Sequence, residues 1–286
     1  MSNILITGST GFIGSHILKK FYAKNKIYLI LRNNNRSKKK IISNKNIKVI
    51  SYNKYHDLNK KLKNITANTI IHCATHYVKN HNVKDIEKLT QSNILFGNII
   101  LENLTNMKTK KFINFSTVWE DYDSIRDNSL NLYSAYKKGF SFLTDYYKKL
   151  KKDVKFYNIM ISDTFGENDK RLKIINVLKN NYNKKKITKI VSKNLFINLL
   201  NVNDIVDAIN ILLKTNLKSG KYVLKNNITH KIGDIIKSFN NANNRKIRVK
   251  WLSQKIIKEK IYPYQPLLGW RPKQSKIIDI INIIKT

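Results

Sequence analysis

Cysteine, proline and long apolar runs are scarce in this sequence of 286 residues. Cys73 is the single cysteine, so an internal disulfide is excluded and a cysteine-based metal site is not expected. His76 and His81 lack the companion ligands that a metal site needs. No apolar run reaches the roughly 18 residues of a membrane span, and the N-terminus enters a strand-like run without a signal-peptide pattern. We therefore expect a cytoplasmic protein with no metal and no membrane contact.

Acidic residues are also few, since 18 Asp and Glu stand against 55 Lys and Arg, a net charge of +37. Such a charge attracts nucleotides, nucleic acids and acidic membranes. The lysines are spread along the whole chain, and Lys, Asn and Ile, which share A/T-rich codons, are all over-used. This pattern favours a composition bias of the genome over selection for an acidic partner, so a nucleic acid is not the expected partner.

The glycines are few as well, but three of the nine lie within one short motif near the N-terminus. An apolar run at residues 4–6 is followed by Gly8, Gly11 and Gly14, and then by a run with helical period. This order predicts a strand, a tight turn and a helix that binds a dinucleotide pyrophosphate. Gly8 can take a positive φ, Gly11 admits the pyrophosphate, and Gly14 lets the helix pack on the strand. The predicted cofactor contacts here are Gly8, Thr10, Gly11, Phe12, Ile13 and Gly14.

Apolar strand patterns alternate with helical patterns through the first part of the chain. Strands are predicted at residues 26–31, 46–51, 69–73, 111–116 and 155–161, and helices at 82–106 and 132–149. This alternation predicts an α/β fold, a Rossmann-type doubly wound parallel sheet. We assign residues 1–165 to the dinucleotide-binding domain and 166–286 to a smaller C-terminal substrate-binding lobe, with the chain crossing back to the sheet. Later helices are predicted at 171–181, 203–213, 231–239 and 275–284, with strands at 221–224 and 246–251.

The residue that closes the second predicted strand indicates which dinucleotide is bound. An acidic residue there selects NAD, whereas an arginine accommodates the 2′-phosphate of NADP. Arg32 occupies this position, and the basic loop that follows to Lys40 contains no acid. We therefore favour NADP(H) over NAD(H), although the loop could also be a solvated lysine-rich surface. Ala74, at the end of the fourth predicted strand, is a further predicted cofactor contact.

Three side chains form a candidate catalytic set. Tyr133 and Lys137 are four residues apart in a predicted helix, so they share one face. A phenol has an ordinary pKa near 10, and a nearby ammonium lowers it. Thr117 follows the fifth predicted strand and could hold a substrate oxygen. This set could exchange a proton with a carbinol or carbonyl while a nicotinamide takes or gives hydride. Tyr and Lys are abundant here, so the order of the elements carries the prediction.

The motifs TGSTGFIG (7–14), NFSTVW (114–119), YSAYK (133–137) and LLGWRPK (267–273) resemble the extended short-chain dehydrogenases/reductases of the NAD-dependent epimerase/dehydratase type. The resemblance implies a nucleoside-diphosphate sugar in the cleft between the lobes. It also implies Tyr133 as the acid–base group, Lys137 as its partner and a ribose anchor, and Thr117 on the sugar O4. The implied cofactor contacts include Tyr133 and Lys137, and the implied substrate contacts are Thr117, Trp119, Asp163 and Arg171.

Family members often form homodimers through two helices, here residues 82–106 and the Tyr133 helix, and Asn93 matches a family asparagine.

Departures from the family pattern reduce the number of reactions that this chain could catalyse. Dehydratases carry Asp-Glu directly after the catalytic Thr, where this chain has Val118 and Trp119, which argues against 4,6-dehydration. The favoured function is 4-keto reduction of a nucleoside-diphosphate-deoxyhexose. A nucleotide-sugar 4-epimerase with tightly bound NAD is the alternative, and a non-catalytic RNA-binding protein of the same fold is the second alternative.

Overall fold

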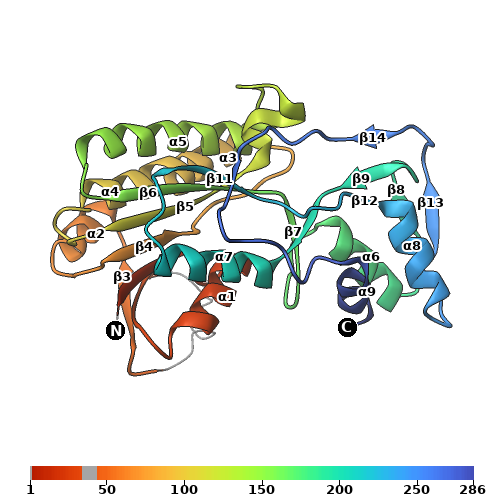
Figure 1. Ribbon diagram of the computed structural model, residues 1–286, viewed down its shortest axis with the longest axis horizontal. Helices are drawn as coiled ribbons and strands as arrows, with labels where there is room; N and C mark the ends of the chain where they lie inside the picture. The colour runs from red at the N-terminus through yellow and green to blue at the C-terminus, as the bar shows by residue number, and fades with distance from the viewer. Residues whose placement is uncertain (1, 34–43) are drawn as a thin grey trace.

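The computed structural model describes residues 2–33 and 44–286, and its centre is an eight-stranded sheet (Figure 1). The strand order is β15-β11-β6-β5-β4-β1-β2-β3, and each of these neighbouring pairs is parallel. The order reverses between β1 and β4, which makes a topological switch point at the carboxyl ends of these strands. The predicted doubly wound fold is thus confirmed. The strands are β1 (Asn3–Thr7), β2 (Lys26–Arg32), β3 (Ile47–Tyr52), β4 (Thr69–His72), β5 (Lys111–Thr117), β6 (Lys155–Ile161), β11 (Gly220–Leu224) and β15 (Gln265–Pro266).

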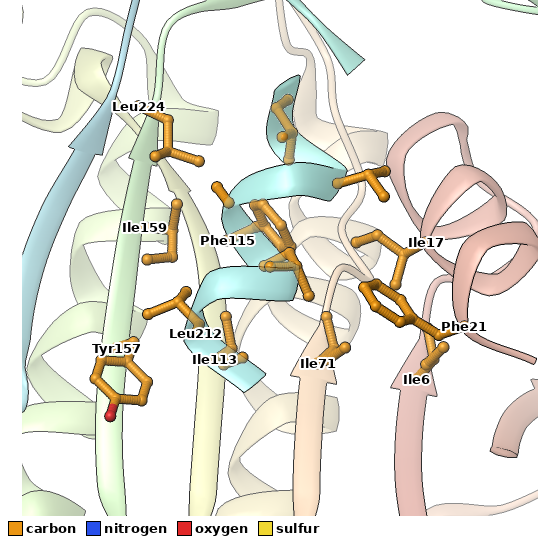
Figure 2. Packing of buried hydrophobic residues seen from close by; sticks show 14 of the residues in the cluster. Ile6, Ile17, Phe21, Ile71, Ile113, Phe115, Tyr157, Ile159, Leu212 and Leu224 are labelled. Carbon is orange, nitrogen blue, oxygen red and sulfur yellow. The ribbon is translucent and has the colours of Figure 1, made fainter. Parts of the chain in front are cut away.

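Helices cover both faces of the sheet because alternate strand residues point to opposite sides. Ile4 and Ile6 of β1 pack with α1 (Phe12–Phe21) and α7 (Val202–Lys214). Figure 2 shows this layer, with Ile17 and Phe21 from one helix and Leu212 from the other above the strands. Leu5 lies on the opposite face, which α2 (Tyr55–Leu62), α4 (Phe96–Glu102) and α5 (Leu132–Leu150) cover. Strands buried on both faces explain the continuous apolar runs of the sequence.

The helix predicted at 82–106 consists of three consecutive helical segments. α3 (Val83–Thr90) leads into a π-helical turn, Gln91–Leu95, and then into α4. Such π turns inside helices are frequent at functional sites. The last segment ends at Glu102, four residues before the predicted end.

The C-terminal part of the chain forms a second apolar cluster beside the sheet (Figure 1). Of its short strands, only β13 falls within a predicted strand, residues 246–251, because runs of two or three residues show no period. Its elements are β7 (Asp163–Phe165), α6 (Ile174–Asn183), β8 (Thr188–Ile190), β9 (Leu195–Ile197), β10 (Leu199–Asn201), β12 (His230–Lys231), α8 (Ile232–Asn241), β13 (Val249–Trp251), β14 (Ile257–Lys258) and α9 (Ile277–Lys285). α7, β11 and β15 return to the Rossmann layers, so the division at residue 165 stays a prediction.

Asp204, at the start of α7, connects the sheet layers to the segment around residues 270–275. Its carboxylate accepts hydrogen bonds from the Lys273 and Gln274 amides and from the Ser275 hydroxyl. Its backbone carbonyl accepts the Trp270 indole N–H at 2.9 Å. Trp270 and Lys273 belong to the LLGWRPK motif, so this motif serves to attach the C-terminal segment to α7. None of the helices in the described ranges is both long and apolar enough to cross a bilayer.

Candidate active site

A cavity of about 450 Å³ lies where the carboxyl ends of the central parallel strands meet. Its walls come from the residues that directly follow β1 and β4, from the ends of β2, β5 and β6, and from α5 and the loop that follows β7. This is the edge of an open α/β sheet where ligands bind. The structure brings every predicted site residue to this one cavity, while their individual roles stay predictions. The predicted residues on its walls are Gly8, Thr10, Gly11, Phe12, Ile13, Gly14, Arg32, Ala74, Thr117, Trp119, Tyr133, Lys137, Asp163 and Arg171.

The glycine turn fits the pyrophosphate of a dinucleotide. Gly8 has φ +67°, and a Cβ there would lie 2.7 Å from the Ala74 nitrogen. A Cβ on Gly14 would lie 2.2 Å from the Gly8 carbonyl oxygen. α1 starts at Gly11 without a side-chain cap, and its first turn carries no acidic residue. The N–H groups of α1 therefore face the cavity with a favourable dipole for an anion.

Arg32 lies at the cavity rim, at the end of β2, with an exposed side chain. Its guanidinium donates long hydrogen bonds of 3.3–3.4 Å to the hydroxyls of Tyr52, Tyr55 and Ser92. Within the described ranges it forms no salt bridge, so its charge is not neutralised by a carboxylate. Such a guanidinium can pair with a phosphate in bidentate geometry. The basic loop predicted after it, residues 34–40, lies outside the described residues.

Asn93, in the π-helical turn, fixes the loop that follows β4. It is buried, and its side-chain oxygen accepts hydrogen bonds from the Thr75 hydroxyl at 3.0 Å and the His76 amide at 2.7 Å. Its amide nitrogen donates to the His76 carbonyl. The Ala74 amide is held in turn by the Thr7 hydroxyl at 3.1 Å. These bonds set the cavity wall that faces the candidate catalytic tyrosine.

Tyr133 is protonated at neutral pH in this structure. Burial raises the pKa of Tyr133 to about 12, although its hydrogen bond with Thr75 acts in the opposite direction. The sequence led us to expect a pKa lowered by the neighbouring ammonium, and this expectation is wrong for the free protein because burial dominates. Burial also lowers the pKa of Lys137 to about 8. The Thr117 hydroxyl accepts a 3.3 Å bond from the Trp119 amide, so its proton remains available to a ligand.

The predicted substrate residues lie in two separate groups. Asp163 forms an ion pair with Lys173 at 2.7 Å, and the Lys173 ammonium lies 4.3 Å from the Trp119 ring. Arg171 instead lies 4.3 Å from the Phe12 ring of the glycine turn, where Asp169 pairs with it. The helix predicted at 171–181 begins only at Ile174, because these ion pairs hold the preceding residues in a loop. Sequence reasoning missed Lys173, which gives no distinct signal in so lysine-rich a chain.

Sequence reasoning also missed Glu120 and Asp121. Both are buried in the segment Val118–Ser124 directly after β5, where 3₁₀ turns are interrupted by a kink that begins at Asp121. Glu120 accepts hydrogen bonds from the hydroxyls of Ser116 and Ser141, whereas Asp121 forms an ion pair with Lys138. The chain has only 18 acidic residues, so two consecutive ones are an unusual pattern. This pattern is the signal that could have identified Glu120 and Asp121 from the sequence.

Comparisons with known proteins agree with the geometry of this site. The model of the NAD dependent epimerase/dehydratase family matches residues 4–224. CDP-abequose synthase of Yersinia pseudotuberculosis is 27% identical over 221 residues, 77% of this chain and 75% of that protein. dTDP-D-glucose 4,6-dehydratase of Dictyostelium discoideum is 31% identical over 75% of this chain and 56% of its own length.

Solved structures also share this fold. The UDP-N-acetylglucosamine 4-epimerase of Methanobrevibacter ruminantium M1 superposes with a TM-score of 0.81 at 17% identity. The superposition covers 99% of this chain and 97% of that one. Together with the family model, which spans well over half of the chain, this leads to one conclusion. The chain belongs to the NAD dependent epimerase/dehydratase family of extended short-chain dehydrogenases/reductases.

Proposed function

We propose that this protein is an NAD(P)-dependent nucleotide-sugar oxidoreductase that reduces the 4-keto group of a nucleoside-diphosphate-deoxyhexose. The observation that carries the proposal is that Tyr133, Thr117 and Lys137 line the same cavity as the glycine turn. A general acid must hold its proton before the reaction, and a phenol with a pKa of about 12 does so at neutral pH. Similarity to CDP-abequose synthases also supports a reductase.

The three residues of the catalytic set have distinct tasks in this reaction. Tyr133 donates its proton to the 4-keto oxygen, and the Thr117 hydroxyl donates a hydrogen bond to the same oxygen. Lys137 stabilises the phenolate that remains and binds the ribose of the cofactor. The nicotinamide, when bound, supplies the hydride.

The acidic residues of the site argue against a dehydration. A 4,6-dehydratase needs carboxyl groups beside the sugar to remove water. Asp163 is the only acidic residue among those that line the described cavity, and Lys173 holds it in an ion pair. The residues directly after Thr117 are Val118 and Trp119. We therefore keep a 4-epimerase with tightly bound NAD as the second candidate, which the structural similarity to 4-epimerases supports.

The two candidates differ in their use of cofactor. We expect the purified protein to oxidise NADPH in proportion to an added nucleoside-diphosphate-4-keto-6-deoxyhexose. A 4-epimerase would instead interconvert two nucleotide sugars without net loss of reduced nicotinamide. Substrate turnover is followed by chromatography and cofactor oxidation by absorbance. If the protein bound no nicotinamide dinucleotide in either form, both candidates would be wrong.

Arg32 is expected to set the preference for NADPH. Because a hydrogen bond to a charged group contributes about 1.5–3 kcal/mol, Arg32→Ala should weaken NADPH binding roughly 10- to 100-fold. NADH binding should change little, since NADH has no 2′-phosphate. Fluorescence titration of both cofactors measures this directly. Lys48→Ala, on the exposed part of β3, serves as a charge-matched control. Equal losses for the two cofactors in Arg32→Ala would contradict the preference.

A homodimer through α3 and α5 is part of the same proposal. Phe142 and Tyr146 are one turn apart on α5 and are 61% and 56% exposed. Leu95, 40% exposed, ends the π-helical turn that follows α3 and packs on α5. Adjacent exposed apolar side chains of this size are typical of an interface. Phe142→Glu should convert a dimer into a monomer in light-scattering measurements, whereas Leu252→Glu, on a distant exposed side chain, should not. A monomeric wild-type protein would refute the dimer.

A further inference from the structure

Glu120 is a buried carboxyl group that the proposed reaction does not use. It has no exposed surface and does not line the cavity. Ser116 donates to one of its oxygens from β5, and Ser141 donates from α5 at 3.0 and 3.3 Å. An ionised carboxylate is an acceptor only, and two donating hydroxyls suit this form. A buried carboxylate needs a counter-charge, because an unpaired buried charge is costly.

Lys137 is the cation of the catalytic set that interacts electrostatically with Glu120, although these two side chains do not come within the 4 Å of an ion pair. Lys137 and Ser141 are four residues apart on α5, so they share one helix face, and Ser141 holds the Glu120 carboxylate there. Lys137 is only 3% exposed. Burial lowers its pKa, and Glu120 is the largest influence in the opposite direction. Burial raises the pKa of Glu120 above its ordinary value. The hydrogen bonds from Ser116 and Ser141, the charge of Lys221 of β11 and, with a smaller effect, that of Lys137 act in the opposite direction and favour the carboxylate.

The other titratable groups around Lys137 carry no charge at neutral pH. Burial lowers the pKa of His72 to about 3, so its imidazole is neutral. Burial raises the pKa of the Cys73 thiol well above its ordinary value. Tyr133 remains a phenol, as described above. Tyr264 interacts electrostatically with Glu120, and its pKa is raised by burial and by its hydrogen bond to Asp121, so it also remains a neutral phenol. Among the described neighbours of Lys137, Glu120 is therefore the group that can supply a negative charge.

We propose that Glu120 is a positioning residue whose buried carboxylate keeps the Lys137 amine in its ammonium form beneath the cavity. Glu120 acts through Lys137 and touches neither substrate nor cofactor. This inference rests on the proposed function, because it assigns Lys137 its task at the ribose and at the phenolate of Tyr133. Two consecutive acids therefore act on two consecutive lysines. Asp121 forms an ion pair with Lys138 outside the cavity, and Glu120 favours the ammonium form of Lys137, which lines the cavity.

The test is the pH dependence of NADPH binding and of 4-keto reduction in Glu120→Gln. NADPH binding and 4-keto reduction both require the ammonium form of Lys137. The affinity and the rate should therefore decline as the pH rises through the pKa of Lys137. Removing the opposite charge of Glu120 makes the Lys137 ammonium less stable and lowers its pKa. The decline of binding and rate at alkaline pH, called here the alkaline limb, should therefore move to lower pH by at least about one unit. Both measurements should stay near the wild-type level at the acidic end of the range. Asp121→Asn is the matched control; it should lower stability and leave the limb in place.

The outcomes separate the inference from the proposed function. A wild-type protein that bound no NADPH would end the proposed function. A wild-type protein that binds NADPH, with the same alkaline limb in Glu120→Gln, would overturn the inference alone. A uniform loss at every pH would also overturn it, since a merely structural role predicts that result. If Glu120→Gln fails to unfold cooperatively, Ser141→Ala replaces it; it removes one donor from the carboxylate and should move the limb the same way by a smaller amount.

Discussion

Tyr133→Phe should lower the rate of 4-keto reduction by about 10²- to 10⁴-fold, the usual contribution of a general acid. The phenylalanine keeps the ring that packs edge-on against Tyr77 at 5.0 Å, so the cavity should keep its shape. Because the lost group is the proton donor, the dissociation constant of NADPH should change less than threefold or so. Stopped-flow absorbance of single turnovers gives the rate, and fluorescence titration gives the affinity.

Tyr136→Phe is the matched control for this experiment. Tyr136 is on the same helix, and its hydroxyl bonds to Thr90 at 2.8 Å away from the cavity. Its removal should leave the rate within about twofold of the wild type, because its hydroxyl touches no reacting atom. A Tyr133→Phe protein that bound NADPH and kept full activity would show that another group supplies the proton. The acid–base role of Tyr133 would then be wrong.

Gly14→Ala should destabilise the protein by more than about 3 kcal/mol, at the upper end of overpacking costs. The added methyl would lie 2.2 Å from the Gly8 carbonyl oxygen and 2.7 Å from its carbon, and both are backbone atoms that cannot rotate away. The helix α1 would have to move off β1, which would open the glycine turn and abolish dinucleotide binding. Urea unfolding monitored by circular dichroism measures the free energy, and NADPH titration measures the binding.

Gly139→Ala provides the comparison within a helix. A Cβ there would meet only the Ile94 side chain at 3.6 Å, which is ordinary contact. Replacing a helical glycine by alanine should therefore stabilise the protein by up to about 1 kcal/mol. Similar effects of the two substitutions on unfolding would mean that α1 does not pack on the turn as closely as the structure shows.

The sequence predicted the strands of the Rossmann half well, because a strand buried on both faces must be apolar throughout. The run at residues 155–161 is one example, and β6 has the same bounds. The site residues were found through the order of the elements, since the carboxyl ends of parallel strands meet at one edge. This rule placed Thr117 and the glycine turn on a common cavity.

Other features of the site could not be predicted, because they depend on contacts between distant segments. The pKa of Tyr133 depends on its burial and on a hydrogen bond with Thr75, which Asn93 holds from the π-helical turn. The pairing of Lys173 with Asp163 depends on where α6 begins. Glu120 gave no periodic signal, since its 3₁₀ segment is short. A pattern of residue types therefore located the site, and the environment of each group decided its charge.

The attachment at Asp204 has a consequence for how the chain matures on the ribosome. The groups that donate hydrogen bonds to the Asp204 carboxylate lie 69 to 71 residues further along the chain. Contacts of such large sequence separation form late, because a long loop must close before they contribute. Until the segment around Trp270 has been translated, the start of α7 has a buried acid without its donors. We therefore expect nascent chains that stop before this segment to depend on chaperones, although they already contain the whole glycine turn and Tyr133.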